Sequence, residues 1–374
     1  MNILDQIDQP TLLLDEAGTR KNISRLSARA REKAVSFRPH FKTHQSAQIG
    51  EWFRDQKVDR ITVSSVEMAE YFALHGWQNI SIAFSLNIRQ IARIEALARQ
   101  VHLEVLIENE EALAALSIPS SSELGIWIKI DAGSARTGVS WQNAAAVLAL
   151  CESVKRNKRL TLLGLLTHSG NTYQASDRIE VCRIFREGVD RLGEVRSFLE
   201  AAGWAGLKVS VGDTPGCSLC PDWSEIDEVR PGNFVFYDAS QAHAGSCAFE
   251  EISLALACPV VAKHPRRREV VVYGGAVHLS KDFLLVGGEK SYGLPALRSG
   301  NRWGAPIPGG RVRALSQEHG MVRIPGTEFD QISIGDLLFI LPAHSCLSVQ
   351  VMGEYLALSG EKISTFNRTR LAGD

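Results

Sequence analysis

Four basic side chains crowd one short stretch near the amino terminus, "VSFRPHFKTH" (35–44). Lys42 stands in it between His40 and His44, after an apolar run typical of the end of a β-strand. Most lysines at such positions simply extend into water. A lysine beside a bound carbonyl compound can instead form a covalent imine with it. The remaining motifs decide between these two interpretations.

A second motif, "VGDTPG" (211–216), has the composition of an anion-binding turn. Gly212 and Gly216 permit close backbone approach, Thr214 offers a hydroxyl, and consecutive amides in such a turn can bind phosphate. An ordinary turn after a strand has the same composition. A lysine together with a phosphate-sized loop suggests pyridoxal phosphate, which needs a lysine for its Schiff base and a cradle for its phosphate.

A third motif, "LPAHSCLSV" (341–349), separates His344 from Cys346 by one residue. In an extended segment the two side chains point to the same face, so an imidazole nitrogen and a thiolate could bind one ion. This ligand pair favours Zn²⁺ over Mg²⁺ or Ca²⁺. The alternative is a buried thiol beside a surface histidine. Cys217 and Cys220 form a rival pair, but no second close pair accompanies them.

The elements that must position these residues alternate between strands and helices from about residue 35 to residue 240. Helical spacing recurs in 65–76, 88–100 and 176–203. Apolar and β-branched runs predict eight strands, at 35–39, 60–64, 80–84, 102–107, 124–131, 160–167, 207–211 and 233–237. This alternation predicts an α/β fold, a (β/α)8 TIM barrel, in which chemistry collects at the carboxyl ends of the strands. An open doubly wound sheet fits less well, because no Gly-rich phosphate turn follows the first strand.

After residue 250 the pattern changes to strand signals without long helices. These runs are 250–264, 268–280, 320–325, 336–344 and 349–359. They predict a mostly β domain, to which the early run "PTLLLD" (10–15) could add a strand. We therefore expect a pyridoxal phosphate-binding barrel over 16–245, and a mostly β domain with the metal-binding motif formed by 1–15 and 246–374.

The composition limits the partners. A formal net charge of −1 over 374 residues gives no electrostatic reason to expect nucleic acid or an anionic membrane. The first residues are acidic where a secretory signal needs a basic start, and no apolar run reaches membrane-spanning length. A cytoplasmic protein is therefore expected. The seven cysteines are expected to be reduced and mostly buried thiols.

Eight segments along the chain carry a family resemblance: "PTLLLD", "FRPHFKTH", "DAGSARTGV", "LLTHSGNTY", "VSVGDTPG", "VRPGNFVFYD", "SQEHG" and "PAHSC". In this order they resemble the D-serine dehydratase and D-threonine aldolase family, which is similar in fold to alanine racemase. The resemblance covers nearly the whole chain. It implies pyridoxal phosphate as cofactor, a barrel followed by a mostly β domain, and a homodimer.

The resemblance also implies roles for single residues. Lys42 occupies the Schiff-base position, and Arg136 corresponds to an arginine near the cofactor's phenolate oxygen. The positions that line the cofactor's ring and phosphate are Tyr173, Gly212, Asp213, Thr214 and, after the expected eighth strand, Tyr237.

In the resembling family, a His-x-Cys pair is typical of zinc-dependent dehydratases, and a His-x-Asp pair of aldolases that use a harder divalent ion. Because this chain has His344 and Cys346, we expect a pyridoxal phosphate- and zinc-dependent dehydratase, although another divalent metal remains open. Its substrate would be a small D-β-hydroxy amino acid resembling D-serine, and its products a 2-oxo acid and ammonia. Lys42 would remove the α-proton, and the metal would bind the β-hydroxyl.

Other activities remain open. A metal-dependent D-threonine-type aldolase would release glycine and an aldehyde. An amino acid racemase and a non-catalytic pyridoxal phosphate carrier are further alternatives, but neither explains a His-x-Cys pair, because neither needs a metal.

Overall fold

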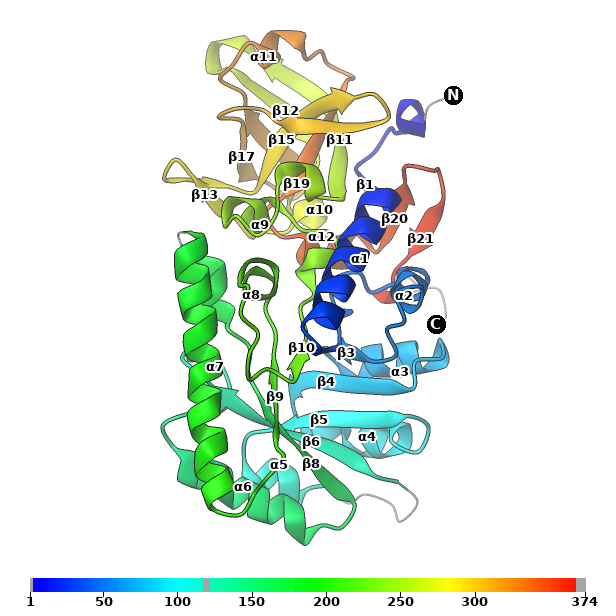
Figure 1. The fold of residues 1–374 in the computed structure, drawn as a ribbon. Helices are drawn as coiled ribbons and strands as arrows, with labels where there is room; N and C mark the ends of the chain where they lie inside the picture. The colour runs from blue at the N-terminus through cyan, green and yellow to red at the C-terminus, as the bar shows by residue number, and fades with distance from the viewer. Residues whose placement is uncertain (1–2, 117–121, 176, 368–374) are drawn as a thin grey trace. The chain divides into compact units, whose positions relative to one another are not determined.

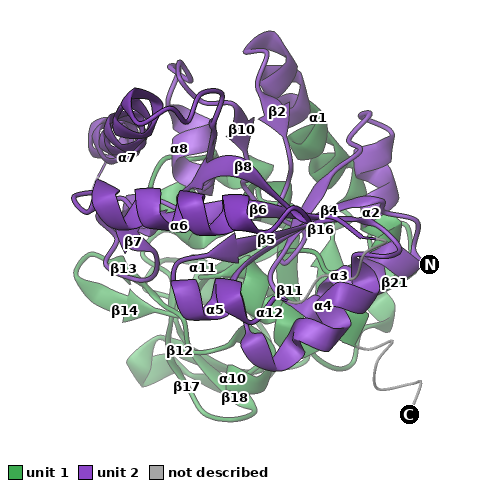
Figure 2. Cartoon of the chain, turned by 90° about the horizontal axis from the view of Figure 1, so that it is seen from below, with its two compact units in different colours: residues 1–24, 43–49, 233–374 green, residues 25–42, 50–232 purple. Residues whose placement is uncertain are grey.

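The computed structural model describes residues 3–116, 122–175 and 177–367. The chain forms two compact units, which Figure 2 shows in different colours. Unit 1 consists of residues 1–24, 43–49 and 233–374, and unit 2 of residues 25–42 and 50–232. The functional division expected at 15/16 and 245/246 stays a prediction.

Unit 2 contains a parallel sheet in the strand order β2-β10-β9-β8-β6-β5-β4-β3. The strands are β2 Ser36–Phe37, β3 Ile61–Val63, β4 Asn79–Ser85, β5 His102–Ile107, β6 Leu124–Asp131, β8 Leu160–Leu166, β9 Lys208–Val211 and β10 Glu228–Val229, with β7 Val139–Ser140 beside β6. Figure 1 labels most of these strands, and Figure 2 labels β2 and β7. The amide of Phe41 donates to the Thr62 carbonyl, and the Thr62 amide donates to the Pro39 carbonyl. These hydrogen bonds join the segments that follow β2 and contain β3, the two ends of the strand order, so the sheet curls on itself. The predicted α/β barrel is confirmed.

Helices pack on the outer face of this sheet (Figure 2). The helices that begin in the first two hundred residues are α1 Glu16–Glu32, α2 Ala47–Arg54, α3 Val66–Leu74, α4 Ile91–Leu97, α5 Glu110–Ala114, α6 Ala144–Arg156 and α7 Arg178–Ala201. Helix α7 begins where the Asp177 carboxylate accepts from the Glu180 amide, and buries Val181, Phe185 and Leu192 at helical spacing. The three predicted helical runs are confirmed, although Ser176 lies outside the described residues. Within the described ranges, no helix is long and apolar enough to cross a membrane.

The eighth strand lies earlier in the chain than the sequence predicted. Residues 233–237 are not a strand, because Asn233–Val235 form a 3-10 helix and Tyr237 has a left-handed φ of 52°. The strand is β10, which pairs in parallel with β9 and β2. The Glu228 carboxylate accepts from Arg38 inside the barrel, so this short polar segment completes the sheet. The apolar run at 233–237 is instead buried within unit 1.

Unit 1 contains a second sheet, in the order β16-β15-β19-β11-β1-β20-β21, with β12, β18 and β17 attached through β11. Its strands are β1 Thr11–Leu14, β11 Leu254–His264, β12 Glu269–Tyr273, β15 Gly293–Ser299, β16 Arg302–Pro306, β17 Arg311–Leu315, β18 His319–Arg323, β19 Leu337–Pro342, β20 Glu354–Ala357 and β21 Lys362–Ser364, with a separate hairpin of β13 Leu284–Val286 and β14 Glu289–Ser291. Strand β1 pairs antiparallel with β11 and parallel with β20. The early run "PTLLLD" therefore contributes a strand to the β-rich unit.

Two of the runs expected to be strands contain helices that carry polar residues. Helix α10 spans Ala276–Leu279 and helix α12 spans Ser345–Met352. The prediction of one extended segment through His344 and Cys346 is therefore wrong. The sequence did not indicate helix α12, because its valines, such as Val349 and Val351, favour strands. In the helix, Ser348 and Val349 are buried on the face that packs inward. The remaining helices are α8 Thr214–Leu219, α9 Ala239–His243 and α11 Glu328–Gln331.

The expectation of reduced thiols holds for five of the seven cysteines. Cys182 of α7 and Cys220, which follows α8, form a disulfide. The free thiols are Cys151, Cys217 and Cys258, which are buried, and Cys247 and Cys346, which are partly exposed. Because the Cys220 sulfur is bonded to Cys182, the rival pair of Cys217 and Cys220 does not supply two thiolates to a metal.

Candidate active site

Polar side chains gather at the carboxyl ends of the unit 2 strands. Lys42 lies in the turn after β2, Arg136 lies between β6 and β7, and both are exposed. His168 follows β8 and is partly buried. Burial lowers the pKa of His168 well below its usual value, and the charges of Lys42, Arg136 and Lys129 lower it further. The structure thus brings Lys42 and Arg136 near a histidine that sequence analysis did not select.

His168 presents a defined tautomer. Its Nδ1 lies within hydrogen-bond distance of the Gly212 carbonyl oxygen. Because a carbonyl can only accept, Nδ1 carries the proton and Nε2 is left as an acceptor. The lowered pKa favours the neutral imidazole, whose centroid lies 6.1 Å from that of the Tyr173 ring. His168 thereby connects the end of β8 to Gly212 of the predicted phosphate turn.

The predicted phosphate turn is held from both sides. Tyr173, on the 3-10 helix Gly170–Gln174, accepts through its hydroxyl from the Thr214 amide at 3.2 Å. The Asp213 carboxylate accepts from the Gly216 amide at 2.6 Å and from the Thr172 hydroxyl at 2.9 Å. Burial raises the pKa of Asp213 to about 7, although these two hydrogen bonds act in the opposite direction. Tyr173, Asp213 and Thr214 therefore lie together, and the cofactor role expected for them stays a prediction.

Two features of this turn fit a phosphate group. The Thr214 hydroxyl is buried and has no hydrogen-bond partner among the residues that the structure describes. A buried hydroxyl without a partner costs free energy, so a ligand oxygen that binds it removes a penalty. At Gly212, a Cβ atom would lie 2.9 Å from the Arg230 carbonyl oxygen. The turn thus approaches the backbone of Arg230, directly after β10, more closely than a side chain would allow.

Below these residues, a charged network fills the barrel interior. Arg38 is only 2% exposed, so its guanidinium does not reach water as a lone strand-end side chain would. It donates to Glu104 at 2.6 Å and to Glu228 at 2.7 Å. The Ser210 hydroxyl also donates to Glu228, and it accepts from Arg230 at 2.7 Å. The network ties β2, β5, β9 and β10 into a fixed floor under the site.

Lys129 adds a buried amine to this interior. It lies on β6, is 5% exposed, and is followed two residues later by Asp131. Burial lowers the pKa of Lys129 to about 7, and the charges of Arg230 and Arg136 contribute to the shift. Two arginines and two lysines around one end of the barrel attract anions such as a phosphorylated cofactor.

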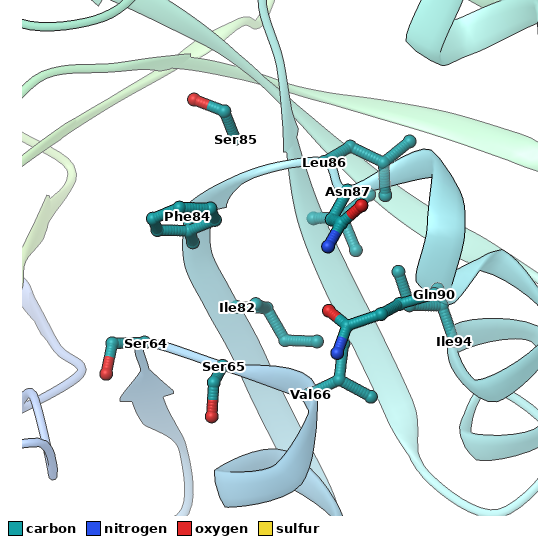
Figure 3. Close-up of a pocket in the computed structure, with 11 residues that line it drawn as sticks. Ser64, Ser65, Val66, Ile82, Phe84, Ser85, Leu86, Asn87, Gln90 and Ile94 are labelled. Carbon is teal, nitrogen blue, oxygen red and sulfur yellow. The ribbon is translucent and has the colours of Figure 1, made fainter.

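A small pocket of about 160 Å³ near the end of β4 does not belong to this site (Figure 3). It is lined by Ile82 together with Val66 of α3 and Ile94 of α4. Asn79 of the same strand accepts from Arg38 in the barrel interior at 2.7 Å. Because side chains alternate along a strand, Ile82 faces the helices rather than the interior. The pocket therefore lies outside the barrel wall.

Unit 1 carries the pair of predicted metal ligands, His344 and Cys346, which is called the metal pair below. His344 is the N-cap of α12, yet its side chain makes no capping hydrogen bond. The buried Asp238 carboxylate accepts instead from the Ser345 amide at 3.0 Å and from the Asn233 side chain at 2.5 Å. Asp238 follows Tyr237, which is buried in unit 1 and does not end a barrel strand. The cofactor role expected for Tyr237 stays a prediction.

His344 is oriented by a carboxylate. Its Nδ1 lies 2.7 Å from an oxygen of Asp282. Burial lowers the pKa of His344, but the Cys346 sulfur and the Asp282 carboxylate outweigh burial and raise it to about 11. Because Nδ1 serves Asp282, Nε2 is the nitrogen that remains for the hydrogen bond with Cys346. A divalent cation could replace that proton between nitrogen and sulfur.

The Cys346 sulfur has further polar neighbours in unit 1. It lies 3.3 Å from the hydroxyl of Thr43 and 3.9 Å from the side-chain nitrogen of Asn233. Among the described residues, no group of three or more His, Cys, Asp and Glu side chains could hold a metal ion. His344 and Cys346 would therefore supply two of the ligands of a metal ion, without a third such side chain among the described residues.

Comparison with known proteins extends over nearly the whole chain. The family model described as "Alanine racemase, N-terminal domain" matches residues 14–240, and "Putative serine dehydratase domain" matches residues 253–358. The chain is 28% identical to D-threo-3-hydroxyaspartate dehydratase of Delftia sp. (strain HT23), with 97% of each chain covered. It is 25% identical to D-serine dehydratase of Dictyostelium discoideum, over 96% of this chain and 95% of that one. D-threonine aldolase of Arthrobacter sp. is also 25% identical, over 91% of this chain and 86% of its own.

Solved structures agree with these matches. A cysteine-to-alanine mutant of D-threo-3-hydroxyaspartate dehydratase, described as the metal-free form, has a TM-score of 0.88 and 25% identity, and covers 98% of this chain and 99% of its own. Alanine racemase from Clostridium difficile 630 has a TM-score of 0.65 at 13% identity, over 96% of this chain and 98% of its own. This match shows that the two proteins share a fold. The chain therefore belongs to the alanine racemase N-terminal domain family, and to its group of D-serine dehydratases and D-threonine aldolases, as the motifs predicted.

Proposed function

We propose that this enzyme is a pyridoxal phosphate- and zinc-dependent dehydratase of a D-β-hydroxy amino acid. The observation that carries the proposal is the pair of His344 and Cys346, whose imidazole is oriented by Asp282. Relatives named D-serine dehydratase and D-threo-3-hydroxyaspartate dehydratase support the reaction type. The metal-free mutant of such a relative, which lacks a cysteine, supports a thiolate ligand.

The residues of unit 2 fit the cofactor. We assign covalent attachment to Lys42, the phenolate side to Arg136, and the phosphate to the turn of Gly212, Asp213 and Thr214 with Tyr173 beside it. Bound pyridoxal phosphate supplies an electron sink for charge that develops on the substrate's α-carbon. The amine of Lys42, released when the substrate's amine takes its place, would take the α-proton. The charged floor below keeps these groups in fixed positions, which limits the reorganisation that proton transfer requires.

The metal pair fits the second half of the reaction. His344 Nε2 and the Cys346 sulfur would hold Zn²⁺, although the same donors accept other divalent metals. Bound zinc supplies a Lewis acid that polarises the substrate's β-hydroxyl, so that it leaves as water or hydroxide. Thr43, which precedes His44 and follows Lys42 in the sequence, contacts the Cys346 sulfur with its hydroxyl. Loss of water and hydrolysis of the product give a 2-oxo acid and ammonia.

The aldolase is the second candidate, because D-threonine aldolase of Arthrobacter sp. is a relative of similar identity. Position 346 argues against it. A thiolate there favours zinc, whereas an oxygen ligand would suit a harder ion. A racemase or a cofactor carrier would leave the His344–Cys346 pair without a role.

A product assay tests the proposal. Purified enzyme is offered D- and L-serine, D- and L-threonine and D-threo-3-hydroxyaspartate, and 2-oxo acid, ammonia, glycine and aldehyde are all measured. We expect 2-oxo acid and ammonia in equal amounts from at least one D-substrate. Glycine and aldehyde as the main products would place the aldolase first. The panel also identifies the side chain that the enzyme prefers.

We further propose a cytoplasmic homodimer without a nucleic-acid or membrane partner. The near-neutral net charge and the family resemblance support this arrangement. Light scattering coupled to gel filtration measures the mass directly, and a monomer at micromolar concentration would refute the dimer.

A further inference from the structure

We propose that Asp282 is a positioning residue for the metal pair, because its carboxylate fixes the ring orientation and tautomer of His344. This inference rests on the proposed function, since it concerns the same metal site. Asp282 lies outside the motifs that identified the pair, in the segment between α10 and β13. It would act through His344 and need not touch the metal.

The segment that carries Asp282 has an unusual backbone. Ser280, at the carboxyl end of α10, has a φ of 69°, a conformation that residues other than glycine rarely adopt. Its hydroxyl accepts from the Asp282 amide at 3.3 Å. Strained conformations of this kind persist where the surrounding structure fixes them. The turn directs the chain so that the Asp282 side chain reaches His344.

The same segment is fastened to the helix that begins at His344. The buried Ser348 hydroxyl lies 3.3 Å from the Leu279 carbonyl oxygen and 3.3 Å from that of His344. Leu279 ends α10, directly before Ser280 and three residues before Asp282. Both partners of the Asp282–His344 bond are therefore held by one packed pair of helices, which restricts their relative movement.

An ordinary surface ion pair is the competing interpretation. The side chains of Asp282 and His344 are 47% and 39% exposed, and exposed pairs contribute little to stability. The distance between the two groups distinguishes this pair from the histidine–carboxylate pair of His278 and Glu318. A carboxylate oxygen of Asp282 lies 2.7 Å from His344 Nδ1, whereas Glu318 comes only within 3.9 Å of His278 Nε2. The relevant quantity is metal affinity rather than stability.

The tautomer explains why metal affinity should depend on Asp282. A metal binds the imidazole only after one ring proton has left, and only the form that keeps Nδ1–H offers the Nε2 lone pair to the metal. The Asp282 carboxylate accepts from Nδ1–H and so favours that form. Hydrogen-bond partners of this kind typically change metal affinity by 10- to 100-fold.

The test compares Asp282→Asn, Asp282→Ala and Asp282→Glu with wild type by titrating Zn²⁺ against a competing chromophoric chelator. We expect zinc affinity to fall about 10- to 100-fold in Asp282→Asn and at least as far in Asp282→Ala. Asp282→Glu should retain more affinity than Asp282→Ala, because the exposed position can accommodate a longer carboxylate. Glu318→Gln is the matched control, since it removes an acid near another histidine of unit 1, and should match wild type.

Two further readouts separate positioning from general damage. The visible absorbance of the bound cofactor should be unchanged in every variant. With saturating Co²⁺, each variant should show the thiolate-to-cobalt absorption band, because Cys346 is intact. Zinc affinities within twofold of wild type in both Asp282→Asn and Asp282→Ala would overturn the inference, and so would an equal loss in Glu318→Gln.

The inference and the proposed function fail differently. If wild type binds no zinc, or if Cys346→Ala binds it as tightly as wild type, the metal site itself is refuted. If wild-type zinc binding depends on Cys346 but not on Asp282, the metal site stands and only the positioning role is lost.

Discussion

Replacing Thr214 by valine should change the stability of the apoenzyme and its cofactor affinity in opposite directions. The substitution Thr214→Val keeps the branched shape and removes the hydroxyl. In the protein this hydroxyl is buried, without a hydrogen-bond partner among the described residues. If the proposed cradle is correct, its partner is an oxygen of the cofactor's phosphate. The apoenzyme therefore has a cost at Thr214 that cofactor binding removes.

The two magnitudes follow from this geometry. A buried polar group without a partner costs about 1–3 kcal/mol, so Thr214→Val should raise the unfolding free energy of the apoenzyme by about 1 kcal/mol or more. A hydrogen bond to a charged group contributes about 1.5–3 kcal/mol, which corresponds to roughly 10- to 150-fold in affinity at 1.4 kcal/mol per factor of ten. Cofactor affinity should fall by that factor.

The assay combines urea unfolding of the apoenzyme with spectroscopic titration of pyridoxal phosphate. Thr172→Val is the matched control, because the Thr172 hydroxyl is buried but satisfied by Ser169 and Asp213. It should destabilise the apoenzyme, since removing a donor leaves those acceptors without it. A Thr214→Val apoenzyme that is less stable than wild type and binds the cofactor with unchanged affinity would refute the cradle.

Four other changes test separate parts of the structure. Borohydride reduction of the holoenzyme followed by peptide mapping should find the cofactor on Lys42, and its recovery on Lys129 would contradict the assignment. Gly212→Ala should lower the unfolding free energy of the apoenzyme by about 1–3 kcal/mol, because the new Cβ meets the Arg230 backbone at 2.9 Å; unchanged stability in urea would disagree with that contact. Reduction of the disulfide, whose cysteines are 38 residues apart, should lower the unfolding free energy by up to about 4 kcal/mol in the chain-entropy description, and a Cys182→Ser variant without any loss would contradict it. Burial raises the pKa of Asp213 to about 7 from 3.8, so ionisation of this carboxyl group lowers the unfolding free energy as pH rises from about 4 to 7. Asp213→Asn, which can still cap α8, should lose less stability than wild type over that pH interval. Parallel profiles of unfolding free energy against pH in the two proteins would contradict the burial of this carboxyl group.

Much of the candidate site could be proposed from the sequence because its residues stand in short continuous motifs. Lys42 lies in "FRPHFKTH", and the phosphate turn lies in "VGDTPG", so both depend on local sequence. The parallel strands were recognised because their apolar runs are bounded by helical patterns. The fold class followed from this alternation.

The errors arose where short segments depend on distant partners. Strand β10 has only two paired residues, Glu228 and Val229, and its place in the sheet depends on Arg38, far away in the sequence. No local pattern identifies it. Helix α12 begins at Ser345 because the Asp238 carboxylate accepts from its amide, a contact over 107 residues. The valine-rich sequence of that helix indicated a strand.

Sequence analysis did not select His168 and Asp282, which contact other residues of the candidate site. His168 stood within the quoted segment "LLTHSGNTY", yet its link to the Gly212 carbonyl depends on the pairing of β8 with β9. Asp282 is 62 residues from His344, in a segment without a motif. Spacing alone reveals ligands that are close in sequence, but not the partners that orient them.

The central claim is that dehydration depends on a metal held by His344 and Cys346. The most direct measurement compares 2-oxo acid release from a D-β-hydroxy amino acid by holoenzyme that has been exhaustively chelated, with and without added Zn²⁺. We expect that chelation abolishes product release but preserves the cofactor's visible absorbance, that Zn²⁺ restores the rate, and that Cys346→Ala is not restored. Dehydration at the full rate by metal-free enzyme would contradict it.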